Sequence, residues 1–351
     1  MPNIARDSHY VPQATLRRWS EDGQHVQAYR ILVSHSEVPE WTLRSIRGLA
    51  YQRDLYTTFA GGQELDEFER WIAKEYEEPG FDAVNKLVAR HRLTPSDWIS
   101  LARFVAAQDV RTPLNFIESM QRWDQQIPAI LENTIRESVR KLQEAKNQGV
   151  RLEPPKDPNA FSELFRVQIE PPVDPNSEEA LIRADVSAGR RLWIATMRHL
   201  LTGAAQVLCQ HRWSVVEPHH NEEWPLTDHP VIRLNYYQPG QYDFRGGWGY
   251  PGSEIMMPLS PRHLLYVQVG KKAPNRLAFS REQTQLVQRL IVERAHRWIF
   301  ARQPIQGVAE IRPRVIDATI VKAEEEAWKS WPEEQLRSEV PYHKKLDNKD
   351  A

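Results

Sequence analysis

The sequence predicts an α+β protein that is predominantly helical, with a small antiparallel β-sheet formed mainly by the C-terminal half. Apolar residues recur at helical spacing through most of residues 1–150, whereas short β-branched runs separated by Pro, Gly and Asp dominate the later chain. The 351 residues include 25 Pro and 15 Gly, which indicates many stiff turns and defined helix starts. With 40% hydrophobic residues, the chain is long enough to bury a substantial core.

Apolar stripes in the N-terminal half predict helices over about residues 65–76, 94–112 and 114–149. Pro79 and Gly80 are expected to end the first of these helices. The second begins at Thr94, because Thr94-Pro95-Ser96-Asp97 is a capping-box pattern with Pro at the first helical position. The third is expected to be interrupted near Pro128.

The remaining chain predicts strands over residues 26–33, 213–217, 231–234, 255–258 and 264–269, and a helix over 281–300. We expect a single α+β domain over residues 1–320. It divides into a helical half (1–150), a Pro-rich connection (151–176) and a mixed half (177–320). Residues 321–351 are predicted to form a charged helix and a frayed tail.

The composition excludes several classes of protein. The 46 Lys and Arg balance the 47 Asp and Glu, so no overall field attracts nucleic acid or an acidic membrane. A lone cysteine, Cys209, excludes an intrachain disulfide and a cysteine-based zinc cluster. No apolar run approaches about 18 residues, so no membrane partner is expected, and we expect a cytoplasmic location. Gly246-Gly247-Trp248-Gly249 lacks the Gly-Lys-Ser/Thr of a phosphate-binding loop and predicts a turn.

Two polar residues continue the apolar face of the second predicted helix. Two steps of three lead from Val105 to Gln108 and then to Arg111, so both side chains should point toward the core or a cleft. A buried guanidinium requires a carboxylate, carbonyl groups or an anionic ligand. Glu69 or Glu75 on the first helix is the candidate partner. The pair would either join two helices or form the wall of an anion or metal pocket.

Two further polar segments are candidates for a site. His9 precedes the extended segment Tyr10-Val11-Pro12-Gln13, which places an imidazole on a rigid backbone, either as a hydrogen-bonded structural residue or as a general acid/base. Thr227-Asp228-His229-Pro230 lies between two β-type runs. It predicts either an Asx-type turn or a carboxylate held at the end of a strand.

These residues resemble a bacterial family known as a domain of unknown function, DUF4238, whose members open with His-Tyr-Val-Pro-Gln. The similarity extends from about residue 8 to 303. It is carried by His9–Gln13, Leu16–Trp19, Asp54–Tyr56, Glu69–Glu75, Gln108, Arg111–Pro113, Thr227–Pro230 and Pro258–Pro261. His229 departs from the Asn usual in that turn. The resemblance implies no particular reaction, but it implies that His9, Pro12, Arg111 and Asp228 share one pattern. Because this pattern agrees with the polar positions that the helical spacing and the turns indicate, we expect one common pocket.

Two functions fit these observations. The first is a binding or structural module, in which His9 and Arg111 tie the N-terminal segment to the core and a Trp-rich surface, drawn from 12 Trp, recognises the partner. The alternative is a metal-dependent phosphodiesterase or nuclease-like hydrolase, with a defence or toxin role. An anionic ligand or nucleic acid would be the partner and a divalent metal the cofactor. The candidate residues of this hydrolase are His9, Arg111 and Asp228 for catalysis, Gln13 and Gln108 for ligand binding, and Glu69 and Glu75 for the metal.

Overall fold

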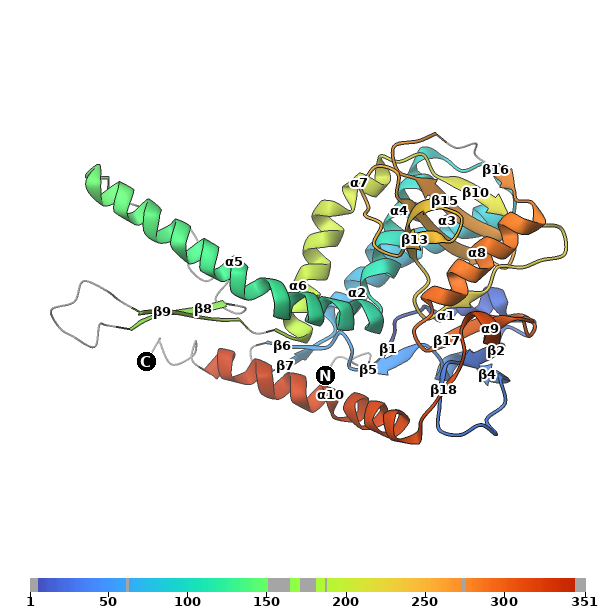
Figure 1. Ribbon diagram of the computed structural model, residues 1–351, viewed down its shortest axis with the longest axis horizontal. Coiled ribbons are helices and arrows are strands. Elements are labelled where there is room, and N and C mark those ends of the chain that lie inside the picture. The colour runs from blue at the N-terminus through green and yellow to red at the C-terminus, as the bar shows by residue number, and fades with distance from the viewer. Residues whose placement is uncertain are drawn as a thin grey trace. The chain divides into compact units, whose positions relative to one another are not determined.

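The computed structural model describes residues 6–60, 63–150, 165–170, 181–186, 188–272 and 276–344. The chain divides into two compact units (Figure 1). The first unit comprises Met1–Thr57, Leu65–Asn115 and Met197–Pro332, and the second comprises Thr58–Glu64, Phe116–Thr196 and Glu333–Ala351. Within the described ranges, none of the helices is both long and apolar enough to cross a bilayer.

A four-stranded sheet in the first unit joins segments from both ends of the chain, in the order β11-β17-β2-β4. Its strands are β2 (His25–Arg30), β4 (Trp41–Ser45), β11 (Leu226–Thr227) and β17 (Trp298–Ala301). Ala28 of β2 pairs with Phe300 of β17 in an antiparallel register. Smaller pairings join β1 (Asp7–His9) to β5 (Tyr51–Arg53) and β3 (Leu32–Val33) to β18 (Val315–Ile316).

The predicted fold class, with one small sheet formed mainly by the C-terminal half, is therefore wrong. Strands are spread along the whole described chain, and β1 to β5 all come from the first 53 residues. The predicted helix over residues 281–300 contributes to this difference, because α8 (Arg281–Arg294) ends before β17. Ile299 and Phe300 point to opposite faces of the sheet and both are fully buried, so both faces are covered at β17.

The helical part of the first unit runs nearly without interruption through α2 (Glu67–Ile72), the π-helical turn η3 (Ala73–Glu77) and α3 (Glu78–Val88). The prediction that Pro79 and Gly80 end a helix is wrong, because Pro79 lies in the first turn of α3, directly after the π-helical turn η3. Gly80 lies where a Cβ would meet the Phe104 side chain at 2.7 Å, so α3 packs closely on α4 (Pro95–Val110). The predicted start of α4 is confirmed, with both hydrogen bonds of the Thr94 capping box present.

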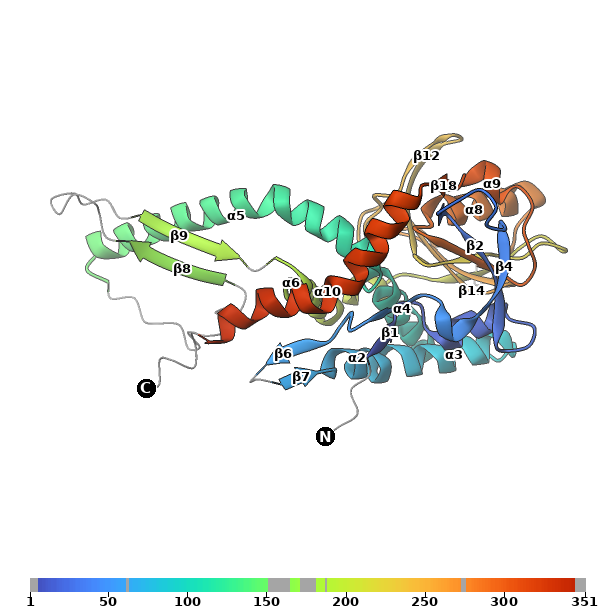
Figure 2. The same cartoon turned by 90° about the horizontal axis from the view of Figure 1, so that it is seen from below.

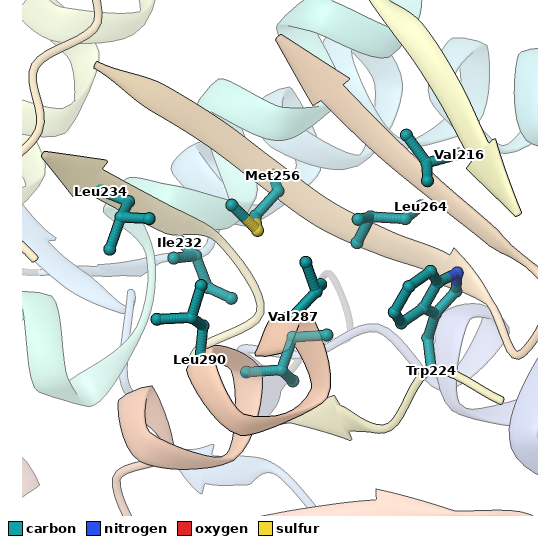
Figure 3. Close-up of a cluster of buried hydrophobic side chains, with 9 residues drawn as sticks. Val216, Trp224, Ile232, Leu234, Met256, Leu264, Val287 and Leu290 are labelled. Carbon is teal, nitrogen blue, oxygen red and sulfur yellow. The ribbon is translucent and has the colours of Figure 1, made fainter. Parts of the chain in front are cut away.

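A six-stranded sheet forms the other half of the first unit, in the order β13-β12-β14-β15-β10-β16. Its strands are β10 (Ser214–Glu217), β12 (Ile232–Gln238), β13 (Gln241–Asp243), β14 (Glu254–Ser260), β15 (His263–Gln268) and β16 (Arg276–Ala278). Figure 3 shows Val287 and Leu290 of α8 directed toward Met256 and Leu264 of the sheet. Val216 belongs to this core, so its neighbour Val215 points to the opposite face of the sheet.

Short elements complete the first unit. They are α1 (Gln13–Leu16), η1 (Arg17–Trp19), η2 (Ile46–Gly48), the π-helical turn η4 (Leu200–Ala204), α7 (Gln206–Cys209) and α9 (Val308–Ile311). Trp19 of η1 is 1% exposed and its indole N–H donates to the carbonyl of Trp224 at 2.7 Å. The N-terminal segment is therefore fixed to the core of the six-stranded sheet, to which Trp224 belongs.

The second unit contains most of α5 (Pro113–Asn147) and α6 (Arg190–His199), the end of α10 (Ala318–Lys344), and two hairpins. The hairpins are β6 (Thr58–Ala60) with β7 (Gln63–Leu65) and β8 (Phe165–Glu170) with β9 (Leu181–Val186), both labelled in Figure 2. Phe116 and Trp193 pack edge to face, with ring centroids 5.2 Å apart. Most of the predicted Pro-rich connection and residues 345–351 of the predicted tail lie outside the described residues, so the predicted domain boundaries stay predictions.

Candidate functional site

Arg111 lies at the C-cap of α4 and is 2% exposed, as the helical spacing predicts. Each of its guanidinium nitrogens has a partner within the protein. Nη1 forms an ion pair with Glu77, Nη2 donates to the main-chain oxygen of His9 at 2.5 Å, and Nε donates to Tyr56 Oη at 3.4 Å. The Tyr56 hydroxyl in turn donates to the Arg111 carbonyl at 2.5 Å. We call these four residues the Arg111 cluster.

Glu77 is the carboxylate partner of Arg111, so the expectation that Glu69 or Glu75 would pair with Arg111 is wrong. The reason is the π-helical turn η3, which inserts one extra residue per turn and so shifts the side chains that follow it around the axis. A residue five positions after the buried Ile72 then shares its face, and that residue is Glu77. An uninterrupted α-helix would have placed Glu75 or Tyr76 closest to this direction.

Glu69 and Glu75, the predicted metal ligands, have different surroundings. Glu69 accepts a hydrogen bond from the Ser8 hydroxyl at 2.8 Å, and burial raises its pKa, an effect that the Ser8 bond and the charge of Arg111 oppose. Glu75 is half-exposed and lies 3.9 Å from Arg103. Across the ranges that the structure describes, no group of three His, Cys, Asp or Glu side chains is arranged to hold a metal ion.

His9 is half-buried beside Tyr51 at the end of β1, with ring centroids 5.6 Å apart. Its Nε2 lies 3.1 Å from the amide nitrogen of Gln13, whose oxygen accepts from Arg17 at 3.2 Å. Burial lowers the pKa of His9, and the positive charge of Arg111 acts in the same direction. The imidazole is therefore mainly neutral at pH 7 and could accept a proton, but Gln13 already occupies one ring nitrogen.

Asp228 lies in the turn between β11 and β12 and is buried. Its carboxylate accepts main-chain hydrogen bonds from His296 at 2.9 Å and from Arg297 at 2.7 Å. The adjacent His229 is buried with its Nδ1 2.7 Å from the Thr112 hydroxyl, and burial lowers its pKa well below the usual range. The turn is thereby fixed to the residue that follows Arg111, which brings His9, Arg111 and the Asp228 turn into one region of the first unit.

Burial raises the pKa of Asp228 to about 6, although its main-chain hydrogen bonds and the charge of Arg297 oppose the shift. Between about pH 4 and pH 6 the folded state therefore holds a proton on Asp228 that the unfolded state releases, so the contribution of Asp228 to the free energy of unfolding falls as the pH rises, by about 3 kcal/mol in total. We expect Asp228→Asn to remove this contribution, so that the stability of the variant relative to wild type rises over the same pH range. The check is urea unfolding at pH 4, 5, 6 and 7, and an equal pH dependence in both proteins would contradict the assignment.

Gln108, the other predicted ligand-binding residue, is completely buried, and neither polar atom of its amide has a hydrogen-bond partner among the described residues. Its neighbour Asp109 accepts a hydrogen bond from the Trp248 indole at 2.7 Å and pairs with Arg233 at 3.2 Å. The glycine-rich segment connects β13 and β14, as the predicted turn between strands requires, and it places Trp248 against α4. Gly246 is required there, because a Cβ would lie 2.8 Å from the Leu234 main-chain nitrogen.

The structure brings together some of the predicted residues and separates others. His9 and Arg111 belong to the Arg111 cluster, Gln13 and Glu69 lie close to it, and the Asp228 turn is joined to it through Thr112. Glu75 is directed to Arg103 instead. The sequence reasoning missed Glu77 and Tyr56. Tyr56 belongs to one of the segments that carry the family resemblance, but neither residue has a spacing that distinguishes it from its neighbours.

Comparison with known proteins gives one match. A family model described as a protein of unknown function (DUF4238) matches residues 8–304. No curated protein and no solved structure matches the chain. The matched range includes the whole Arg111 cluster and the Asp228 turn.

Proposed function

We propose that this chain, which belongs to the DUF4238 family, is a binding module in which His9, Arg111 and Asp228 stabilise the fold and carry out no reaction. One observation carries the proposal. All the guanidinium nitrogens of Arg111 are bonded to groups of the protein itself, and only 2% of the residue is exposed to solvent. A phosphoryl group could bind there only by displacing Glu77 or the main chain of His9.

The other two residues support the same role. Asp228 uses both carboxylate oxygens on main-chain N–H groups and is buried, so it has no oxygen directed toward solvent for a metal or a substrate. His9 lies against Tyr51 and Gln13. Together they join the N-terminal segment, the end of α4 and the turn before β12, which are far apart in sequence.

The test is cleavage of bis(4-nitrophenyl) phosphate by the full chain with Mg²⁺ or Mn²⁺, compared among wild type, His9→Ala and His25→Ala. His25 is an exposed histidine paired with Asp22, and it serves as the matched control. We expect no cleavage above that of the metal alone, or a residual rate equal in all three proteins. Cleavage that His9→Ala loses while its melting temperature and the His25→Ala rate are unchanged would refute the proposal.

A further inference from the structure

A cavity of about 580 Å³ lies in the first unit, away from the residues of the Arg111 cluster. It is lined by residues from the end of α3, the loop before α4, the first turn of α4 and β10. Val215 of β10, which faces away from α8, is one of these lining residues. Its volume falls within the range of small-molecule sites, roughly 300–1,000 Å³.

The cavity is lined by the consecutive residues Arg90, His91 and Arg92, all exposed. Among the described residues, no carboxylate lies within ion-pair distance of Arg90 or Arg92, whereas Lys86 close by is bonded to Asp97 at 2.7 Å. The chain as a whole is electrically balanced, so two unpaired guanidinium groups at one opening form a local positive site. Guanidinium groups bind phosphate with two parallel hydrogen bonds, which makes an anion the expected occupant.

Arg90 adopts a left-handed conformation with φ of 60°. Arg90 N–H donates to Leu87 O at 2.9 Å and His91 N–H donates to Lys86 O at 2.8 Å, which is a Schellman ending of α3. Glycine usually occupies this position, and a residue with a Cβ there is strained by about 1 kcal/mol. The sequence thus places a long cationic side chain where the backbone alone favours glycine.

Trp98 also lines the cavity. It is half-buried on the first turns of α4, and no ring contact or cation–π contact to it is found among the described residues. Leu87 and Val215 add apolar surface below it. An inorganic anion would leave this apolar wall uncovered, whereas a planar ring would stack on the indole, a contact worth about 1–3 kcal/mol.

We propose that this cavity binds a free nucleoside monophosphate, with its phosphate on Arg90 and Arg92 and its base stacked on Trp98. The inference rests on the proposed function, because it names the ligand class of the binding module. A ligand with both a phosphate and an aromatic ring is the simplest chemistry that uses both the cationic and the apolar walls.

The experiment is calorimetric titration of the full chain with adenosine 5′-monophosphate, comparing wild type, Arg90→Gly, Trp98→Leu and Arg302→Ala. Arg90→Gly relieves the left-handed strain, so its melting temperature should equal or exceed that of wild type while its affinity falls roughly tenfold or more. Trp98→Leu keeps the cavity apolar and should weaken binding to a similar extent. Arg302→Ala, which removes a surface charge paired with Glu223 instead, should bind as wild type does.

Three further titrations separate the ligand chemistries. Adenosine and inorganic phosphate should each bind at least tenfold more weakly than the nucleotide. Equal affinity for inorganic phosphate, unchanged affinity in Arg90→Gly, no binding of the nucleotide, or binding of a short single-stranded oligonucleotide alone would each overturn the inference. These outcomes are independent of phosphodiester cleavage, so a failure here leaves the proposed role of the Arg111 cluster standing.

Discussion

Arg111→Ala is expected to lower the free energy of unfolding by about 3–5 kcal/mol, the usual effect of removing one partner from a buried ion pair. Glu77, 14% exposed, would keep its charge without a partner. The carbonyl of His9 and the hydroxyl of Tyr56 would also lose hydrogen bonds. Urea unfolding followed by circular dichroism measures the loss.

Two variants make this prediction specific. Arg302→Ala removes an arginine from a surface pair with Glu223 at 3.0 Å and should change stability by less than about 1 kcal/mol. Combining Arg111→Met with Glu77→Leu removes both charges and should recover part of the stability lost in Arg111→Ala. A melting temperature of Arg111→Ala equal to that of wild type would show that the cluster is not structural.

Trp19→Ala should lower the free energy of unfolding by a similar amount, about 3–5 kcal/mol, because it leaves a cavity at a fully buried position. It also leaves the carbonyl of Trp224 without its indole donor. Trp19→Phe keeps one six-membered ring but loses the pyrrole ring and the hydrogen bond, so a smaller loss of about 1–3 kcal/mol is expected. Equal losses in the two variants, measured by urea unfolding, would contradict the importance of packing here.

Short-range sequence patterns predict the helices and strands that depend only on residues close to them in the chain. The capping box at Thr94 fixes the start of α4, and the helical period predicts the burial of Arg111. The same reasoning fails at Trp298–Ala301, where apolar residues continue the stripe of α8 but form β17. The strand forms because β2 and β11 supply its hydrogen-bond partners, and neither is near it in sequence.

The candidate site also contains some residues that the sequence predicts and others that it does not. The family resemblance and the helical period together identify His9, Arg111 and the Asp228 turn as one group. The partner of Arg111 depends on the π-helical turn η3, which changes the phase of the helix by one residue without a recognisable sequence signal. Main-chain acceptors such as the carbonyl of His9 have no side-chain signature, and the left-handed φ of Arg90 is likewise invisible until the backbone is known.

The pairing of β2 with β17 has a consequence for how the protein is made. During synthesis, at about 5–20 residues per second, β2 leaves the ribosome many seconds before β17 exists. The Tyr29 hydroxyl meets its acceptor, the Arg312 carbonyl, across 283 positions of the chain. Until then β2 has an unpaired edge and apolar side chains without cover. A chain stopped before residue 298 should therefore aggregate, because it cannot complete this sheet.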